Sequence, residues 1–144
     1  MLHPADAARH SALLLLLTGC AGSQDPATVG QAAGLPAGEQ EVRLAIGETR
    51  TLPGGARLSL TAVPGDSRCP RDVACVWAGS VAATLHLTAG YADTTATINS
   101  MMEPRAFAFR GWRVALLGAS PDPEAGTPIP PESYRVSLTV SRAP

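Results

Sequence analysis

The side chains that could carry chemistry are few, and most of them contain sulfur. Cys69 and Cys75 are separated by five residues. Two thiols at this distance could bind a metal or exchange electrons, but Cys-x5-Cys is not the Cys-x-x-Cys spacing of thiol oxidoreductases. No second pair of cysteines supplies the four ligands of a structural zinc site. The spacing therefore predicts neither a redox centre nor a zinc site.

The remaining candidates for catalysis are isolated. His86 is the only histidine beyond residue 20, so a Ser-His-Asp or Cys-His site would have a single possible base, and no motif surrounds it. Met101 and Met102 offer soft sulfur ligands. However, adjacent residues of an extended backbone point in different directions, which disfavours a copper site. Gly54-Gly55 predicts a turn and not a phosphate loop. We predict no catalytic residue, no metal and no cofactor, and hence no enzyme.

Composition limits the class of protein. The chain has 144 residues, of which 45% are hydrophobic and 16% are charged, and this fits one globular domain with a core. All 11 basic side chains are arginine, and the formal net charge is -1. Such a chain has no basic field for nucleic acid, so we expect no nucleic-acid partner.

The first 19 residues predict a targeting segment. Its leucine run is shorter than the roughly 20 residues that span a bilayer as a helix. The run ends in Leu17-Thr18-Gly19-Cys20, which resembles the lipobox of bacterial lipoproteins. The resemblance implies a signal peptide over residues 1–19, cleavage before Cys20, acylation of Cys20 and stable anchoring to a membrane. Because Ala21 follows, it implies the outer membrane if the cell has two. The alternative is an ordinary secretory peptide, and both alternatives export the domain.

The rest of the chain divides into a tether and a domain. Residues 20–39 are rich in small residues, glycine and proline, and this composition predicts a flexible tether. Residues 40–144 then form a single domain. Thiols of an exported domain tend to oxidise. With Cys20 acylated, Cys69 and Cys75 are each other's only intramolecular partner, so we expect a disulfide that contributes about 2 kcal/mol.

The predicted disulfide closes a ring inside a distinctive stretch. Asp66-Ser-Arg-Cys-Pro, five positions, then Cys75-Val-Trp-Ala-Gly79 resembles small uncharacterised bacterial secreted proteins and lipoproteins, a likeness that supplies no activity. We expect the ring to present charged residues outward and Trp77 to lie on the core face. We expect the ring to be a structural staple that shields one end of the fold, with a binding loop as the alternative. The candidate binding residues are Arg68, Pro70, Arg71, Asp72 and Trp77.

Hydrophobic residues alternate with polar ones along most of the domain, which predicts strands. Residues 42–46 and 57–62 are expected to form a hairpin, followed by a strand over 77–88 and a threonine-rich edge strand over 91–98. Further strands are expected near 107–116 and over 134–141, with a proline-rich loop over 120–132. The pattern predicts an all-β fold, an antiparallel β-sandwich of seven to eight short strands, with a small β-barrel as the alternative.

These observations predict a lipid-anchored protein of the bacterial cell envelope that acts as a non-enzymatic binding or structural module. Its expected partners are the membrane, through the lipid anchor, and another envelope protein. The alternative is an inhibitor of an exported protease. In that case the Cys69-Cys75 loop would present Pro70-Arg71-Asp72 as a rigid bait, and rigidity favours affinity by lowering the ordering cost.

Overall fold

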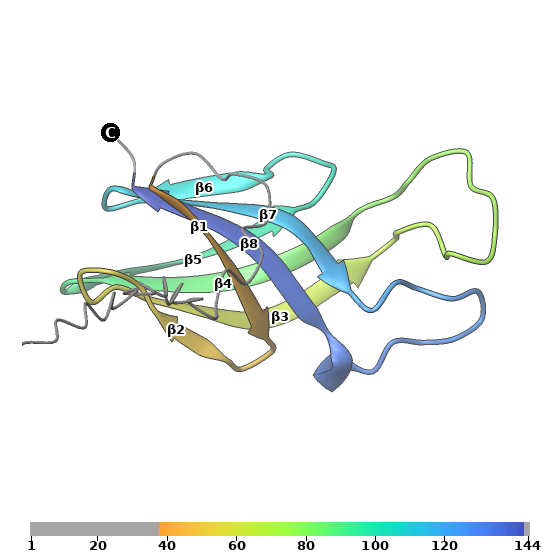
Figure 1. The fold of residues 1–144 in the computed structure, drawn as a ribbon, viewed down its shortest axis with the longest axis horizontal. Helices are drawn as coiled ribbons and strands as arrows, with labels where there is room; N and C mark the ends of the chain where they lie inside the picture. The colour runs from red at the N-terminus through yellow and green to blue at the C-terminus, as the bar shows by residue number, and fades with distance from the viewer. Residues whose placement is uncertain (1–37, 143–144) are drawn as a thin grey trace, which may run out of the picture. The chain divides into compact units, whose positions relative to one another are not determined.

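The computed structural model describes residues 38–142, which form two antiparallel sheets of four strands each (Figure 1). The first sheet has the order β1-β8-β7-β6, and the second has the order β2-β3-β4-β5. The sheets stack without closing into a barrel, so the predicted β-sandwich is confirmed and the barrel alternative is wrong. The strands are β1 (Glu39–Ala45), β2 (Thr49–Thr51), β3 (Arg57–Asp66), β4 (Val81–Ala89), β5 (Ala92–Asn99), β6 (Ala106–Phe109), β7 (Trp112–Ser120) and β8 (Arg135–Arg142).

The core lies between the sheets because every second residue of the central strands points inward. In β4 the inward residues are Val81, Ala83, Leu85 and Leu87, and all of them are buried. Each fully buried leucine, valine or isoleucine contributes about 1.5–3 kcal/mol through the area it removes from water. The largest fully buried side chains come from both sheets: Leu44, Leu58, Leu60, Leu85, Leu87, Ile98, Leu138, Val81, Val114, Val136 and Val140.

The hairpin expected from residues 42–46 and 57–62 is wrong. β1 pairs with β8 in the first sheet, and the short strand β2, which the alternation did not predict, is the hairpin partner of β3. The chain changes sheets at Gly47, which has a positive φ of 84° and whose amide donates to the carbonyl of Leu60 at 2.8 Å. Alternation fixes which residues face inward but not which strand lies alongside, so it could not distinguish these pairings.

The β4–β5 hairpin and the edge position of β5 are confirmed. Gly90 has a φ of 65° in the connection, a conformation that glycine adopts without strain, and the pairing runs unbroken from Ala89–Ala92 to Ala82–Asn99. β5 is the last strand of its sheet. The loop over residues 120–132 is also present, apart from one 3-10 turn at Pro131–Ser133.

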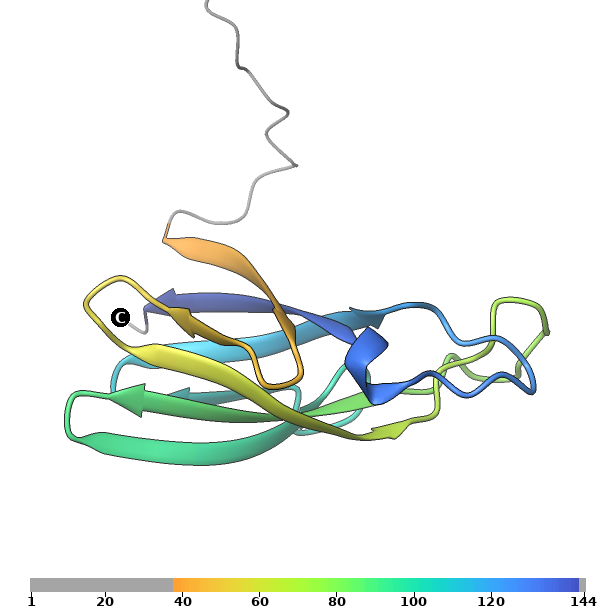
Figure 2. The same cartoon turned by 90° about the horizontal axis from the view of Figure 1, so that it is seen from below.

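Three connections lie at the same end of the sandwich, and the two longer ones extend to the right in Figures 1 and 2. They are residues 67–80 between β3 and β4, 100–105 between β5 and β6, and 121–134 between β7 and β8. We call this group of connections the loop end. β3 and β7, which lead into it, both contain register shifts, after Leu60 and after Leu116. Such bulges increase the local twist and redirect the strand ends.

Candidate functional site: the loop end

The 67–80 loop extends from the second sheet and is closed by a disulfide. Cys69 and Cys75 form the expected disulfide, with their Cα atoms 5.9 Å apart. Below the ring the two arms of the loop are joined by backbone hydrogen bonds, from Ser67 N to Ser80 O at 2.8 Å and from Cys69 N to Ala78 O at 2.9 Å. The two backbone hydrogen bonds and the disulfide therefore restrict the backbone conformation of the loop at its base and in its middle.

Gly79 permits this close approach of the two arms. Its φ is 68°, and a Cβ atom at this position would lie 1.8 Å from the carbonyl oxygen of Ser67. The clash would be with backbone, which cannot rotate away as a side chain can. No residue other than glycine therefore fits here without moving the loop.

Buried serines fix the roots of two connections in the loop end. Ser100 Oγ accepts a hydrogen bond from the amide of Val81 at 3.1 Å, and Ser80 Oγ accepts one from the amide of Met101 at 3.1 Å. The two hydroxyls lie 3.4 Å apart, and both serines are buried. Because the side chains satisfy amides that no strand partner reaches, the 100–105 connection is held against the base of the 67–80 loop.

Arg68 corrects the expectation that the ring presents this residue outward. Its side chain is 14% exposed and forms a two-pronged ion pair with Asp66, from Nε to Oδ1 at 2.9 Å and from Nη2 to Oδ2 at 2.7 Å. The guanidinium also donates to the carbonyls of Ala119 and Pro121 at the end of β7. Arg68 therefore connects the second sheet to the first. We call Asp66, Arg68 and their partners the Arg68 clamp.

The interactions of the Arg68 clamp change the pKa values of Asp66, Tyr134 and Arg68. Burial raises the pKa of Asp66, but the side-chain and backbone hydrogen bonds from Arg68, its charge and the hydroxyl of Tyr134 outweigh burial and lower the pKa below its ordinary value of 3.8. Tyr134 donates to Asp66 Oδ2 at 3.1 Å, and burial together with this bond raises the pKa of Tyr134. The pKa of Arg68 is raised by its hydrogen bond to Asp66. At neutral pH the ion pair is therefore fully charged.

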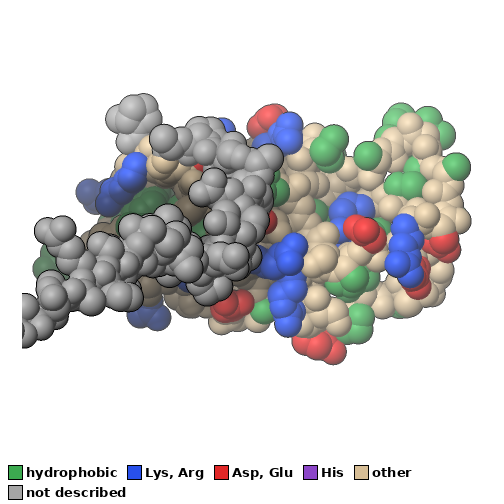
Figure 3. Space-filling model, in the orientation of Figure 1, with side chains coloured by type: hydrophobic (Ala, Val, Ile, Leu, Met, Phe, Trp, Pro, Cys, Tyr) green, Lys and Arg blue, Asp and Glu red, His purple; other side chains and the backbone are tan. Residues whose placement is uncertain are grey.

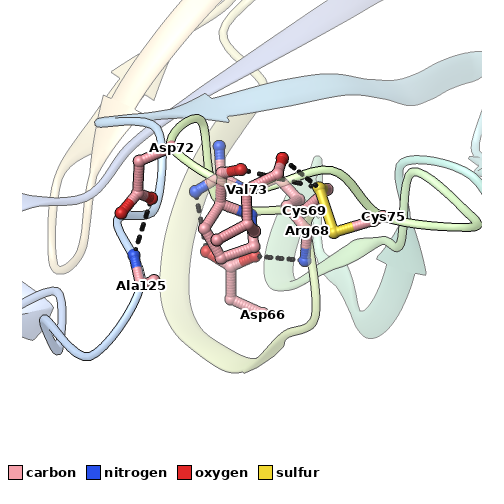
Figure 4. The surroundings of a disulfide bond; sticks show 8 residues. Asp66, Arg68, Cys69, Asp72, Val73, Cys75 and Ala125 are labelled. Carbon is pink, nitrogen blue, oxygen red and sulfur yellow. Dashed lines mark hydrogen bonds and ion pairs between the residues drawn. A yellow bond between two sulfur atoms is a disulfide. The ribbon is translucent and has the colours of Figure 1, made fainter.

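Arg71 and Asp72 are exposed, but both bind the 121–134 connection. The amide of Arg71 donates to the carbonyl of Pro123 at 3.0 Å, and its guanidinium pairs with Glu124. The carboxylate of Asp72 accepts a hydrogen bond from the amide of Ala125 at 2.8 Å (Figure 4). The charged side of the ring is thus engaged within the molecule, and Pro70 begins this docked segment.

Trp77 lies in the loop and not on the core face, so that expectation is wrong. Its side chain is 81% exposed, and that of Val76 is 93% exposed. The alternation of β4 begins only at Ser80 and Val81, because the positive φ of Gly79 turns the chain before the strand starts. Trp77 therefore lies before β4 and is not one of the residues that the strand directs into the core.

Trp77 belongs to an exposed apolar surface, which we define by Val73, Val76, Trp77, Met101, Met102 and Leu117. Hydrophobic side chains gather at this end in Figure 3. A groove of about 410 Å³ is lined by Trp77, Met101 and Met102 together with Ser67 and residues 78–80. A second hollow, of about 330 Å³, adjoins it and reaches Leu117 and Cys69. Tryptophan and methionine are enriched in protein interfaces, and exposed clusters of apolar residues mark binding surfaces.

His86 is half-buried on the outer face of the second sheet, and its Nε2 lies 3.1 Å from Asp93. Ser59 is its strand neighbour, but the hydroxyl of Ser59 donates to the main-chain carbonyl of His86 and not to the ring. This geometry lacks the contact between nucleophile and base that acyl transfer needs. His86 is four residues along β4 from Ala82, the partner of Asn99, and so about 13 Å from the end of the hairpin, beyond which the methionine pair lies.

Within residues 38–142 no three His, Cys, Asp or Glu side chains gather in a way that could hold a metal ion. Within the same range no helix has the length and apolar content needed to cross a membrane. The predicted signal peptide, Cys20 and most of the tether lie outside the described residues. Comparisons with protein-family models, with curated proteins and with solved structures give no match.

Reasoning from sequence identified the disulfide and the surrounding loop but missed several members of the site. The alternation pattern of the sequence does not indicate that Val76, Met101 and Met102 share a surface with Trp77. It also does not indicate that Ser80 and Ser100 hold the loop backbone. A usable signal was present, since Ser80 and Ser100 flank β4 and β5, which pair in a hairpin. The contact of Asp66 with Tyr134, 68 residues away, had no local signal.

Proposed function

We propose that this protein is a lipid-anchored envelope protein whose sandwich domain binds another protein through the apolar surface of the loop end. The observation that carries the proposal is the exposure of Val76 and Trp77 on a loop fixed by a disulfide, a hydrogen-bonded stem and the Arg68 clamp. Exposing large apolar side chains to water is unfavourable, and holding them rigidly lowers the entropy lost when a partner covers them.

The charges around the apolar surface favour a protein partner over an anionic membrane. Arg68 and Arg71 are paired with Asp66 and Glu124, and the exposed Arg105 lies beside Glu103, which accepts a hydrogen bond from its amide. With the further carboxylates Asp72, Asp122 and Glu132, the loop end has no excess of cationic side chains. A loop that inserts into anionic lipid carries free cationic residues beside its aromatic side chain. An apolar centre with a polar rim is instead the anatomy of a protein interface.

The interface is tested by photo-crosslinking in intact cells. A benzophenone amino acid at position 77 should capture a defined partner protein other than the chain itself, and the same group at position 91 should not capture that protein. Tyr91 is a matched control because it is also fully exposed but lies on the β4–β5 hairpin, away from the loop end. The purified partner should then bind the wild-type chain at least about tenfold more tightly than the Trp77→Ser variant, as expected for an aromatic anchor. Equal capture at both positions, or equal affinities, would refute the proposed surface.

The anchor is tested separately. Labelled fatty acid should be incorporated into the wild-type chain and not into Cys20→Ser, and the mature protein should begin at Cys20. A mature chain that retains Met1 would exclude export by this route. Loss of the anchor and loss of the binding surface are independent results, because residues 1–37 and the loop end are probed by different measurements.

The alternative of a protease inhibitor stays a prediction with less support. A bait segment has to be presented to the active-site cleft of the protease, whereas Arg71 and Asp72 bind the 121–134 connection. Mass spectrometry of mixtures with secreted proteases tests this alternative, and a stable complex that is lost in an Arg71→Ala variant would favour it over the apolar surface.

A further inference from the structure

β5 is an edge strand with one side of its backbone unpaired among residues 38–142. The amide of Ser100 donates to Val81 O at 3.0 Å, toward β4, whereas the amide of Asn99 donates to Pro104 O at 2.8 Å, away from β4. Main-chain groups of successive residues point to opposite sides of a strand. The N–H and C=O groups of Asp93, Thr95 and Thr97 therefore face outward along the edge, and all three residues are exposed.

The other three sheet edges carry features that discourage pairing with another chain. β2 has three residues and includes Arg50, and β6 has only four residues. β1 has seven residues but alternates charged side chains along its length, Glu39, Glu41 and Arg43. Short strands and charged residues are the usual protection of an exposed edge.

β5 has none of these protections along its centre. It has eight residues, its pairing with β4 contains no bulge, and it contains no proline and a single charged residue, Asp93, near its start. Threonine and isoleucine supply half of its residues, and both favour extended backbone. An unpaired edge of this kind is a template for one more strand, so the chemistry of its occupant is that of an extended polypeptide.

We propose that this occupant is β5 of a second copy of the chain, paired antiparallel about a two-fold axis at Thr95. The two second sheets would then form one continuous eight-stranded sheet. The axis falls at Thr95 because it is the middle of the three outward residues, so that Thr95 pairs with itself and Asp93 pairs with Thr97 of the second copy. An axis at Ala96 would instead require the amide of Asn99, which already binds Pro104.

This register is complementary in charge and hydrogen bonding. Asp93 never faces Asp93 of the second copy, and its carboxylate instead faces a threonine hydroxyl that can donate to it. Thr97 Oγ1 already lies 2.9 Å from Thr84 Oγ1 on the outer face, which shows that cross-strand threonine pairs form in this sheet. Facing threonines and hydroxyl–carboxylate pairs stabilise antiparallel strands. The pairing would add about six backbone hydrogen bonds across the edge.

The interface is smaller than a standard one, so the dimer should be weak and depend on concentration. Replacing Thr95, the residue on the two-fold axis, by a charged residue tests this dimer. We expect Thr95→Lys and Thr95→Glu each to weaken self-association of the full chain by about tenfold or more in sedimentation equilibrium at low salt, because each places like charges face to face. An equimolar mixture of the two variants should restore the dimer. Thr61→Lys is the matched control, since this exposed threonine lies on the interior strand β3 and should leave association unchanged.

Three outcomes would overturn the proposal. The first is a wild-type chain that stays monomeric throughout the concentration series. The second is a Thr95→Lys chain that associates like the wild type. The third is a mixture of the two Thr95 variants that fails to associate. Association that is lost in Trp77→Ser but kept in Thr95→Lys would place the contact at the loop end. Because the proposed partner binding is measured with a different protein, the failure of either proposal leaves the other testable.

Discussion

Replacement of Arg68 by alanine should destabilise the domain by removing the side chain that connects the two sheets at the loop end. The guanidinium makes two hydrogen bonds to Asp66 and donates to the carbonyls of Ala119 and Pro121. Hydrogen bonds to charged groups contribute about 1.5–3 kcal/mol each, and breaking a buried ion pair costs about 3–5 kcal/mol. Water can reach part of the vacated space, because the side chains of Arg68 and Asp66 are 14% and 10% exposed. We expect a loss of about 3 kcal/mol in the free energy of unfolding at pH 7.

The pH dependence separates loss of the ion pair from loss of packing. The pKa of Asp66 is lower in the folded chain than its ordinary value of 3.8. Its ionised form therefore stabilises the fold above pH 4, and this contribution disappears as the pH falls through the lower, folded-state pKa. Urea denaturation should show that the difference in unfolding free energy between the wild type and Arg68→Ala is largest at pH 7 and decreases as the pH falls through the folded-state pKa of Asp66. The part that comes from the bonds to the carbonyls of Ala119 and Pro121 should remain. Double-mutant analysis with Asp66→Asn should show a coupling of about 1–3 kcal/mol.

Two results would refute this reasoning. One is a difference in unfolding free energy below about 1 kcal/mol at pH 7, the range of exposed ion pairs. The other is a difference that does not decrease between pH 7 and acid pH, which would assign the effect to the packing of Arg68 and to its bonds with Ala119 and Pro121, and not to the ion pair with Asp66.

Four further changes have expected outcomes. Gly79→Ala should cost about 3 kcal/mol in urea denaturation, because the new methyl group would meet the carbonyl of Ser67, whereas the same exchange at Gly55, where nothing lies within 4 Å, should cost less than half as much. Reduction of the disulfide should lower the unfolding free energy by about 2 kcal/mol without unfolding the sandwich, and circular dichroism should retain the strand signal. Tyr134→Phe should cost about 1 kcal/mol at pH 7, through the lost bond to Asp66. Trp77→Ser should leave the melting temperature unchanged, since the side chain is mostly exposed, and a fall of more than about 5 °C would contradict the position we describe.

Alternation along the chain was enough to predict the layers of the fold. Val136, Leu138 and Val140 repeat every second residue and are buried in β8, so period 2 identified the strand and its inward face together. The same signal could not assign partners, and β1 was placed beside β3 when it lies beside β8. Either neighbour buries the same face of β1, so the choice depends on the course of the chain near Gly47.

The candidate site was predictable where covalent chemistry dominates and unpredictable where distant contacts do. Cys69 and Cys75 were each other's only expected intramolecular partner, and the structure contains their disulfide. Arg68 looked like a solvated charge because its carbonyl partners lie more than 50 residues away. Trp77 was misplaced because hydrophobic residues are normally buried, and a binding surface is where that expectation fails.

The stem of the 67–80 loop has a consequence for engineering. The loop leaves the sheet at Ser67 and returns at Ser80. These two residues are joined by hydrogen bonds of their backbone and side-chain groups. A segment whose ends are held together can change length cheaply, since doubling a flexible loop costs about 0.6 kcal/mol in closure entropy. A foreign peptide grafted between Cys69 and Cys75 would be displayed in cyclic form, and it would replace the contacts that Arg71 and Asp72 make with the 121–134 connection.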